Sequence, residues 1–506
     1  MAECGEVIME MRAGDVFEAE IDSIGCNAEG IARSGGFTVF IPFTDAGERV
    51  SARVARIDKS RAFAEKIEIL RASEYRVKPP CAYFEKCGGC DCMHLAYGRQ
   101  TEHKERILKE TLSKFFDISD TEFLPFTHGE KRFFYRNKLQ IPVAADRSGN
   151  TRIGFYEKAS HRVVDIKSCM LHGAWADKII AAVRKYSERY GVSAYDERTG
   201  KGILRHIVAR NFGGETDVLS GETVRADRAD KGNLRYNAAR NFDDVSGRFG
   251  NISASGFDGG ETSVLLVINA DELPEYSGLV DILAAETDGF SLHISVNKKN
   301  TNVILGGGAK TLVGNPRMSY RTASGIEASV SPLSFAQVNG EVRDLIYADT
   351  AEFTRGADAV IDAYSGGGVL TAMLAGSAER VYGIEVVKEA VADADTLAVR
   401  NGIRNVENIL GEAEKKLPPL VAKLKREEKK LAVVLDPPRK GCGEAVVGAL
   451  KRSLPEKIAY ISCNPATLGR DLSLLQEKYD IISVRGYDMF PNTKHIEVLC
   501  RLEIKN

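Results

Sequence analysis

The last third of this 506-residue chain alternates short apolar runs with segments of helical character. From about residue 320, "DAVIDAYSGGGVLTAMLA" is typical of a strand, a glycine-rich turn and a helix. Further strands are indicated at "RVYGIEV", "LAVVLDPPRKG" and "IAYISCNPA", and an edge strand at "IEVLCRLEI". Strands that alternate with helices predict a parallel, doubly wound sheet. Such sheets bind ligands at the carboxyl ends of their strands, so the residues that follow each strand are the first candidates for chemistry.

Two regions of different pattern precede this α/β region. Residues 9–72 alternate apolar and polar side chains, with Gly and Asp between the runs, which predicts a small β-barrel. Such barrels either bind oligonucleotides or serve as structural modules. Residues 133–300 mix strand-like runs with one amphipathic helix near 174–190, which predicts an α+β domain. We therefore expect an OB-like barrel at 1–73, an α+β central domain at 74–318 and a Rossmann-like domain at 319–506.

The central region contains an internal repeat. The segment "KGILRHIVARNF" at 201–212 recurs as "KGNLRYNAARNF" at 231–242. The second copy has Asn where the first has Ile203 and Ile207, so it has lost part of its buried face. We predict that residues 213–258, rich in Gly, Asp, Ser and Arg, are an inserted partial duplication that loops out or is disordered. A loop that contacts RNA is the alternative.

Composition bounds the compartment and the partners. No apolar run approaches the roughly 18 to 20 residues that span a bilayer, and "MAECGEVIMEMRAGD" is too acidic for a secretory signal, so we expect a cytoplasmic protein without membrane association. The formal net charge is −2, so any contact with nucleic acid has to come from local basic patches. The ten cysteines are not expected to form a disulfide framework, and the clustered ones are better interpreted as metal or catalytic residues; the turn-rich segment "CAYFEKCGGCDC" is expected to need a metal.

The glycine-rich turn indicates a nucleotide-like ligand. Glycines 366–368 lie between a strand that ends at Asp362 and the following helix, where backbone without side chains allows close approach. Glu385 ends the next strand about twenty residues later, where such folds place the carboxylate that binds a ribose. No Walker lysine follows the glycines, so phosphate transfer is not expected. The absence of GxGxxG spacing favours S-adenosylmethionine over a dinucleotide.

Three polar residues follow or begin the later strands. Asp436 ends the third strand, Cys463 ends the fourth and Glu497 begins the last. A thiol and a carboxylate at one edge of a sheet form a nucleophile and base pair, and a thiolate can add to C6 of uracil to activate C5. A thiol that only packs is the alternative for Cys463. Arg439 follows the Asp-Pro-Pro segment where amino-methyltransferases have an aromatic residue, which counts against amino-group methylation.

These motifs, in this order and spacing, resemble a known family. "DAYSGGG", "GIEV", "LDPPRKG", "ISCNPATLGRDL" and "DMFPNTKHIEVL" are similar to the S-adenosylmethionine-dependent RNA uracil-C5 methyltransferases, which make 5-methyluridine in ribosomal and transfer RNA. The resemblance implies a class I methyltransferase fold with an N-terminal TRAM domain. It implies that Cys463 attacks uracil C6 and that Glu497 removes the C5 proton. The residues implied to hold the cofactor are Gln337, Tyr364, Glu385 and Asp436.

The clustered cysteines resemble the iron–sulfur segment of the same family. "CAYFEKCGGC" with "DIKSCML" implies a [4Fe-4S] cluster held by Cys81, Cys87, Cys90 and Cys169, with Cys92 as an extra thiol. A four-cysteine zinc site remains open, since spacing does not distinguish the two. Uracil methylation is redox neutral, so the resemblance implies a structural or RNA-contacting cluster.

The partner implied by the resemblance is RNA. The barrel together with the cysteine segment favours 23S ribosomal RNA, with transfer RNA or a non-catalytic RNA-binding role as alternatives, and no obligate protein partner is implied. Further RNA contacts are expected from "YRNK" at 135–138 and from "ILRHIVAR". Three features depart from the family: Ser365 stands where Cys is common, Glu412 where Asp is common, and the 213–258 insertion has no counterpart.

Overall fold

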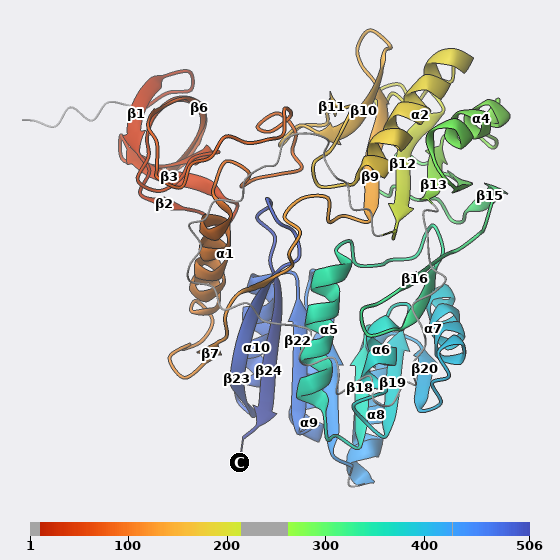
Figure 1. Cartoon of the computed structure of the whole chain (residues 1–506). Helices are drawn as coiled ribbons and strands as arrows, with labels where there is room; N and C mark the ends of the chain where they lie inside the picture. Colours follow the sequence, from red (N-terminus) through yellow and green to blue (C-terminus); the bar gives the residue numbers. More distant parts are fainter. Residues whose placement is uncertain (1–10, 214–261, 428, 506) are drawn as a thin grey trace, which may run out of the picture. The chain divides into compact units, whose positions relative to one another are not determined.

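The computed structural model describes residues 11–213, 262–427 and 429–505 (Figure 1). The chain divides into two compact units. One comprises residues up to Glu110 with 156–161 and 490–495, and the other comprises the rest. Each unit is described by itself. No helix within the described ranges is long and apolar enough to cross a membrane.

The first unit begins with a strongly curled, six-stranded sheet, as the alternating pattern of residues 9–72 predicts (Figure 1). Its core contains many small residues, among them Ala32, Ala52 and Ala62, and register shifts between the two longest strands allow the sheet to bend. The strand order is β1-β5-β6-β4-β3-β2. The strands are β1 (Val16–Glu20), β2 (Ser23–Ile24), β3 (Glu29–Ser34), β4 (Phe37–Pro42), β5 (Arg49–Asp58) and β6 (Arg61–Arg71).

The cysteine segment that follows has little regular structure, as its turn-rich composition predicts. An isolated bridge joins Cys87 to Glu157, and the backbone N–H groups of Asp91 and Cys92 both donate to the Asn492 carbonyl at 3.0 Å. The segment 490–495 therefore holds the cysteine turns through its main chain. Helix α1 (Tyr97–Leu112) follows the cysteine segment.

The second unit contains a seven-stranded sheet covered by two helices. Five of its strands and helix α2 lie where the pattern predicts them, whereas α4 was not predicted. Helix α2 buries Trp175, Ile179 and Val183 on one face, which explains its amphipathic period. The order is β11-β10-β9-β12-β13-β14-β15. The elements are β9 (Lys138–Ala145), β10 (Thr151–Tyr156), β11 (Val163–Asp165), β12 (Leu204–Asn211), β13 (Thr262–Ile268), β14 (Phe290–Val296), β15 (Lys310–Val313), α2 (Ala174–Tyr190) and α4 (Tyr276–Glu286).

Strands β12 and β13 flank the predicted insertion and pair with each other. They are antiparallel, with Asn211 opposite Thr262. The first copy of the repeat forms β12. The second copy, and all of the predicted insertion beyond Gly213, lie outside the described residues.

A nine-stranded sheet forms the rest of the second unit, in the order β20-β19-β18-β21-β22-β24-β23-β7, with β8 also paired to β23. Strands β20 to β22 along this order are parallel, as predicted, but β24 pairs antiparallel with both β22 and β23. The strands are β7 (Glu122–Phe123), β8 (Thr127–His128), β18 (Ala359–Ala363), β19 (Arg380–Glu385), β20 (Val406–Leu410), β21 (Leu431–Leu435), β22 (Lys457–Ser462), β23 (Tyr479–Asp488) and β24 (Glu497–Ile504).

The prediction that "IEVLCRLEI" is an edge strand is therefore wrong. The side chains of the first four residues of β24 are all buried, because β22 and β23 flank the strand and helices cover the sheet. The sequence pattern shows where a strand lies but not which strands flank it, and β23 was not predicted. The C-terminal hairpin places β24 inside the sheet, next to the strand that precedes Cys463.

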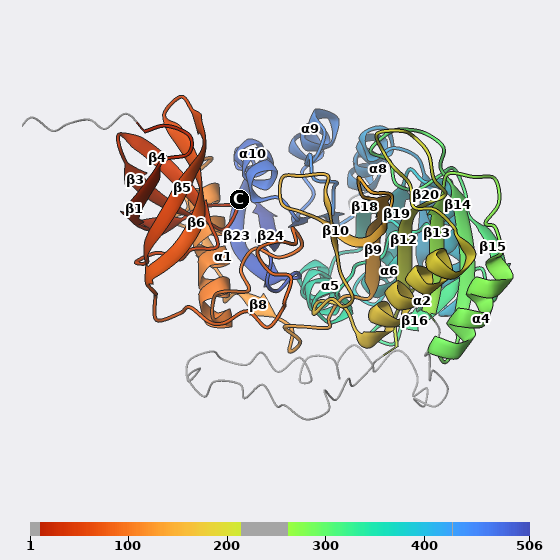
Figure 2. The ribbon, with the colours of Figure 1, turned by 90° about the horizontal axis from the view of Figure 1, so that it is seen from above.

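Helices cover both faces of this sheet, which confirms the doubly wound architecture (Figure 2). Helices α5, α6 and α7 pack in sequence on one face, and α8, α9 and α10 pack on the other. A hairpin of β16 (Met318–Arg321) and β17 (Glu327–Val330) packs against α7. The helices are α5 (Gly340–Thr354), α6 (Val369–Leu374), α7 (Lys388–Arg400), α8 (Ala413–Arg426), α9 (Glu444–Ser453) and α10 (Pro465–Leu475).

Candidate active site

Four of the predicted site residues lie at one edge of the nine-stranded sheet. Glu385 ends β19, and Tyr364, Asp436 and Cys463 directly follow β18, β21 and β22. These four strands are parallel neighbours, so their carboxyl ends meet at the same edge. The structure thus brings together residues that are up to 99 positions apart in the chain, from 364 to 463.

Glu497 joins the same edge because β24 runs antiparallel to β22. Ser462 pairs with Val498, so Cys463 and Glu497 are the next residues along the two strands. The Cys463 side chain is half-buried, whereas Glu497 is only 6% exposed. A thiol and a carboxylate therefore occupy adjacent positions on neighbouring strands.

The ionisable groups at this edge influence one another. Burial and, to a smaller extent, Asp436 raise the pKa of Glu497 to about 8, against an opposing effect of the Arg439 guanidinium. Burial also raises the pKa of the Cys463 thiol, Glu497 adds to the increase, and Arg439 opposes it. Burial raises the pKa of Asp436 to about 7. Two carboxyl groups and a thiol thus share a site in which Arg439 favours the charged forms of Cys463 and Glu497.

Helix α10 holds the backbone of Arg439 close to Cys463. Asn464 caps the helix by accepting from the Ala466 N–H at 3.1 Å, and its Nδ2 donates to the Arg439 carbonyl at 3.1 Å. Thr467 Oγ1 donates to the same carbonyl at 3.2 Å. The Asn-Pro pair after Cys463 is a typical helix start, and it also fixes the loop after β21. We did not predict this role of Arg439, which only the paired geometry of the two loops reveals.

The glycine turn presents open backbone beside Glu385. The Glu385 carboxylate accepts from the N–H groups of Gly366 at 2.9 Å and Val387 at 2.8 Å. A side chain at Gly366 or Gly367 would meet nothing within 4 Å, whereas a Cβ at Gly368 would lie 2.6 Å from the Ala394 Cβ. The first two glycines therefore leave space for a ligand, and Gly368 allows α7 to pack closely.

Further groups beside this turn suit a nucleoside with an amino-acid tail. Asp362 is buried, with one oxygen accepting from Thr371 at 2.6 Å and the other, Oδ1, without a partner. Burial raises the Asp362 pKa to about 7. Val386 and Val387, which directly follow Glu385, are 58% and 49% exposed and offer an apolar surface for a planar base. These residues fit S-adenosylmethionine, which has a ribose, an adenine and a charged amino group. Neither valine was predicted from the sequence.

Tyr364 and Gln337 are positioned by polar contacts. Tyr364 has a left-handed φ of 72°, and its hydroxyl donates to Glu414 at 3.3 Å. Gln337 lies in the loop before α5, where its carbonyl accepts from Asn137 at 3.0 Å. Asn339 caps α5 and donates to the Met489 carbonyl just beyond β23, which pairs with β24 at Glu497. The Gln337 loop thus reaches the edge of the sheet that carries Glu497.

Two aromatic residues near the site were not predicted. Phe335 lies two positions before Gln337 and is 77% exposed, which is unusual for so large an apolar side chain. The second residue is Tyr347 on α5. Burial raises the pKa of Tyr347 well above its ordinary value, and the nearby Asp436 carboxylate is the next largest cause of the increase. Neither residue is part of a recognisable motif, so only the fold shows their position.

Three of the four predicted cluster cysteines are close together in the sequence. No metal-binding group is assembled around them among the residues that the structure describes. Cys81, Cys87 and Cys90 are half-buried and belong to the first unit, and Cys169 belongs to the second. Burial raises the pKa of Cys87, and nearby Cys81 raises it further. Among residues 11–213, 262–427 and 429–505, no three His, Cys, Asp or Glu side chains are arranged to hold a metal ion. The [4Fe-4S] assignment and its zinc alternative therefore stay predictions.

Comparisons with known proteins cover nearly the whole chain. Residues 313–505 match a family described as tRNA (uracil-5-)-methyltransferase, and residues 11–67 match the TRAM domain. An uncharacterized RNA methyltransferase of Halalkalibacterium halodurans is 35% identical over 496 residues, covering 97% of this chain and 98% of the relative. One from Clostridium tetani is 32% identical over 493 residues, covering 97% and 96%.

One solved structure shares the fold along almost the full length. It is the Pyrococcus abyssi tRNA (uracil-54, C5)-methyltransferase in complex with S-adenosyl-L-homocysteine. Its TM-score is 0.70 at 24% sequence identity, and the match covers 96% of this chain and 100% of that one. The likeness extends to the curled N-terminal sheet and confirms the mixed α/β fold class.

Proposed function

Because this chain belongs to the RNA (uracil-5-)-methyltransferase family, we propose that it transfers a methyl group from S-adenosylmethionine to C5 of a uracil in RNA, forming 5-methyluridine. The observation that carries the proposal is the position of Cys463, directly after β22, and of Glu497, at the start of β24, as the next residues beyond the Ser462–Val498 pair. Both lie on the edge of the sheet that also presents the glycine turn. A nucleophile, a base and a cofactor cradle therefore face one space.

Cys463 is the nucleophile in this proposal. Uracil C5 is a weak nucleophile until a group adds to C6, and a thiolate performs that addition. The Sγ–C6 bond forms, and the electrons of the C5=C6 double bond move to C5 to give an enolate. Deprotonation of Cys463 is opposed by burial and by Glu497, and it is favoured by Arg439. The guanidinium thus supports the thiolate form.

The cofactor is held by residues along the glycine turn. Glu385 and the open backbone of Gly366 and Gly367 suit the ribose, and the exposed valines suit the adenine. Gln337, Tyr364 and Asp436 complete the set that the family resemblance implies. When bound, S-adenosylmethionine supplies an electrophilic methyl group for the C5 carbanion.

Glu497 acts as the base that completes the reaction. After methylation, C5 still bears its original proton. The Glu497 carboxylate accepts that proton, the C–H electrons re-form the C5=C6 double bond, and the Sγ–C6 bond breaks to free Cys463. A pKa of about 8 makes Glu497 a stronger base than an ordinary carboxylate while leaving part of it ionised near neutral pH.

For the RNA, we propose 23S ribosomal RNA, supported by the combination of a TRAM domain with the cysteine segment. Transfer RNA is the alternative, because the matching family is described by that substrate. In either case the uracil has to leave its stack, at a cost of a few kcal/mol that is smaller in a loop than in a duplex. The exposed Phe335 ring beside Gln337 suits stacking against bases that remain.

The test of the chemistry uses RNA that contains 5-fluorouracil. Fluorine at C5 cannot leave as a proton does, so the reaction stops at a covalent complex between Cys463 and C6. We expect wild-type protein with S-adenosylmethionine to form an adduct that survives denaturing electrophoresis. The Cys463→Ala variant should form none, and Cys26→Ala, which removes an exposed cysteine elsewhere, should form as much as wild type. Wild-type protein that binds RNA and cofactor yet forms no adduct contradicts the mechanism.

The substrate is tested separately. Total RNA from a strain that lacks the gene is incubated with the protein and isotopically labelled S-adenosylmethionine, and the labelled uridine is then mapped. Label in 23S ribosomal RNA supports the proposed substrate. Label confined to transfer RNA contradicts it. If no RNA is labelled although the protein still forms the adduct with 5-fluorouracil RNA, then total RNA lacks the target in an accessible form. That result rejects mature ribosomal RNA as the substrate.

A further inference from the structure

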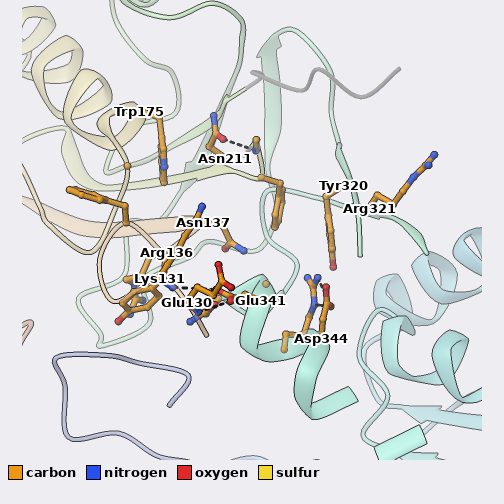
Figure 3. A pocket seen from close by; sticks show the side chains of 18 residues that line it. Glu130, Lys131, Arg136, Asn137, Trp175, Asn211, Tyr320, Arg321, Glu341 and Asp344 are labelled. Carbon is orange, nitrogen blue, oxygen red and sulfur yellow. Dashed lines mark hydrogen bonds and ion pairs between the residues drawn. The ribbon is translucent and has the colours of Figure 1, made fainter. Parts of the chain in front are cut away.

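Helices α5 and α10 each carry an adjacent arginine and aspartate that form an ion pair. On α5 the pair is Arg343 with Asp344 at 2.7 Å, and it lines a pocket of about 400 Å³ (Figure 3). Asp344 also accepts from the Ala323 N–H at 2.8 Å, so this pair fastens the turn of the β16 hairpin to α5. On α10 the pair is Arg470 with Asp471, also at 2.7 Å. Because α10 begins two residues after the proposed nucleophile, its ion pair has the more direct bearing on the chemistry.

Asp471 is a buried carboxylate that accepts hydrogen bonds on both oxygens. It is only 1% exposed. Its Oδ1 accepts from Arg470 Nε at 2.8 Å. Its Oδ2 accepts from the hydroxyl of Tyr460, a buried residue of β22, at 2.6 Å and from the Cys442 N–H at 2.8 Å. A buried charge bonded to several donors is held in one place, so Asp471 ties the sheet to the loop that follows β21.

That loop, residues 436–442, is named here the Arg439 loop and contains a tight turn. The Gly441 N–H donates to the Pro438 carbonyl at 2.9 Å, which closes a β-turn with Arg439 at its second position. Gly441 has a φ of 80°, and a Cβ there would lie 2.6 Å from both Arg470 Nη2 and Asp471 Oδ2. Glycine therefore allows the turn to lie directly against the ion pair.

Helix α10 holds the Arg439 loop at several points along one face. The cap and first turn of the helix donate to the Arg439 carbonyl, as described above. One turn later, Arg470 Nη2 donates to the Lys440 carbonyl at 3.0 Å, and Asp471 accepts from Cys442. These contacts recur every three or four residues, the spacing that places side chains on one face of a helix. The residues that make them are Asn464, Thr467, Arg470 and Asp471.

The position of the Arg439 loop matters for the reactivity of Cys463. Burial raises the pKa of the Cys463 thiol, Glu497 and Asp436 add to the increase, and Arg439 opposes it. The Arg439 side chain is exposed. Since the attraction between charges falls with distance, an exposed side chain acts steadily on a neighbour only where its backbone is held close.

We propose that Asp471 is a positioning residue, which holds the Arg439 loop on α10 and thereby keeps the Arg439 guanidinium near Cys463. The inference rests on the proposed function, since it assumes that Cys463 reacts as a thiolate. It adds a residue that has no contact with RNA or cofactor in the proposed mechanism and yet sets the reactivity of the nucleophile. It also gives a role to the Arg-Asp pair at the end of the "ISCNPATLGRDL" motif.

The first test measures the reactivity of Cys463 without RNA. Free protein is treated with iodoacetamide over a range of pH, and alkylation of the peptide that contains Cys463 is followed by mass spectrometry. The variant Asp471→Asn keeps the size of the side chain but removes its charge, so it holds the Cys442 N–H and Arg470 less firmly. We expect the rate near neutral pH to fall about tenfold and the midpoint of the pH profile to rise by about one unit.

Tyr479→Phe is the control for a loss of stability alone. The Tyr479 hydroxyl donates to the Leu450 carbonyl at 3.2 Å and to the Pro455 carbonyl at 3.0 Å. This residue begins β23, at the opposite end of the strand from the part that pairs with Glu497. Tyr479→Phe should lower the melting temperature but leave the alkylation profile unchanged. Asp471→Asn with a lowered melting temperature and a wild-type profile would show a purely structural role and overturn the proposal.

Variants of Arg470 test the same contacts from a position that is half exposed. Arg470→Met removes both the donor to the Lys440 carbonyl and the charge beside Asp471. We expect a shift in the same direction as for Asp471→Asn but smaller, and Arg470→Lys, which keeps the charge, should lie closer to wild type. If Asp471→Asn does not fold, a wild-type profile for Arg470→Met overturns the proposal.

A double-mutant cycle tests whether Asp471 acts through Arg439. In protein that already carries Arg439→Met, the guanidinium is absent, so Asp471→Asn should shift the alkylation profile no further. The two single shifts should therefore not add. A double variant whose shift equals their sum overturns the proposal, because Asp471 would then act by another route.

RNA that contains 5-fluorouracil separates this inference from the proposed function. Among the variants, the rate of adduct formation should follow the rate of alkylation. If wild-type protein forms no adduct while the alkylation profiles change as expected, the proposed function fails and the role of Asp471 stands. If wild-type protein forms the adduct and Asp471→Asn alkylates and reacts like wild type, the inference alone fails.

Discussion

Arg439 is a cation at the proposed catalytic edge, and it favours the charged forms of both Cys463 and Glu497. Its side chain is exposed, yet its carbonyl is held by two donors from α10. The residue was noted in the sequence only because it is not aromatic. Its electrostatic effect depends on two loops that meet in space, and a sequence pattern does not show that.

Replacement of Arg439 by Met should slow formation of the thiolate. Without the guanidinium the pKa of Cys463 rises, and each unit of increase lowers the thiolate fraction near neutral pH about tenfold. We expect the rate of adduct formation with 5-fluorouracil RNA to fall at pH 7 and to recover as the pH is raised. Arg452→Met on α9 is the control and should leave the pH profile unchanged. An unchanged pH profile for Arg439→Met contradicts the assigned role.

The Glu497→Gln variant should separate methyl transfer from product release. Gln cannot accept the C5 proton, so the bond between Cys463 and C6 should persist after methylation. We expect ordinary uridine-containing RNA to accumulate as a covalent complex that carries the transferred methyl group. The matched control is Glu503→Gln, at the far end of the same strand, which should release product normally. Normal turnover by Glu497→Gln would assign the base to another residue.

The same substitution should change stability in a pH-dependent way. Glu497 has a pKa of about 8 in the folded protein and 4.5 as its ordinary value. Between these values the unfolded chain loses the proton while the folded protein retains it, so stability is lost as the pH rises toward 8. Glu497→Gln should therefore have a higher free energy of unfolding than wild type at about pH 9 but not at about pH 5. Urea unfolding at the two pH values measures the difference.

At the scale of elements, the sequence predicted where the strands that end in candidate site residues lie in the chain. It predicted the order of the strands in the sheet less well. Strands β18, β19, β21 and β22 lie where apolar runs end in Asp362, Glu385, Asp436 and Cys463, because burial on both faces gives continuous apolar sequence. Strand β23 alternates buried and exposed residues less regularly and escaped prediction. The placement of β24 between β22 and β23 brings Glu497 to Cys463, and that pairing is a property of tertiary contacts.

The residues of the candidate site also divide into those that a sequence pattern predicts and those whose position depends on tertiary contacts. Residues in recognisable motifs, such as Cys463 and Glu385, were predicted and lie at the expected edge. Val386, Tyr347 and Phe335 were missed because their significance depends on exposure and on neighbours distant in the chain. A valine after a strand is ordinary in sequence, and only its open position beside Glu385 distinguishes it.

Two adjacent glycines should respond oppositely to the same substitution. Gly368 has a φ of 81° and no room for a Cβ, so Gly368→Ala should lower the free energy of unfolding by about 1–3 kcal/mol. Gly367 has neither constraint, so Gly367→Ala should fold with near wild-type stability. Its methyl group projects into the space proposed for the cofactor and should weaken S-adenosylhomocysteine binding about tenfold. Urea unfolding and calorimetric titration distinguish the two effects, and equal stability for both variants contradicts the packing argument.

At the scale of the whole molecule, the cysteines are the largest open prediction. The family resemblance predicts a [4Fe-4S] cluster on Cys81, Cys87, Cys90 and Cys169. Protein purified without oxygen should then contain iron and sulfide and show the brown colour of such clusters, and Cys87→Ser should abolish both. Bound zinc in a colourless sample would contradict the cluster. Cys442→Ser is the control, since this buried thiol lies in the catalytic sheet region and should leave the iron content unchanged.

The pairing of Asn211 with Thr262 has a consequence for how this protein can vary. Two residues that face each other in a ladder can be joined by a chain of almost any length, because the entropy of closing a loop grows only slowly with that length. This junction is thus a point at which relatives can gain or lose sequence without disturbing the sheet. A shortened protein, with Asn-Gly in place of 213–261, would join Asn211 to Thr262 through the three residues Phe212, Asn and Gly, and it should keep its melting temperature within a few degrees and still form the adduct. Lineages could in this way acquire new RNA targets by exchanging a connector while the catalytic chemistry is inherited intact.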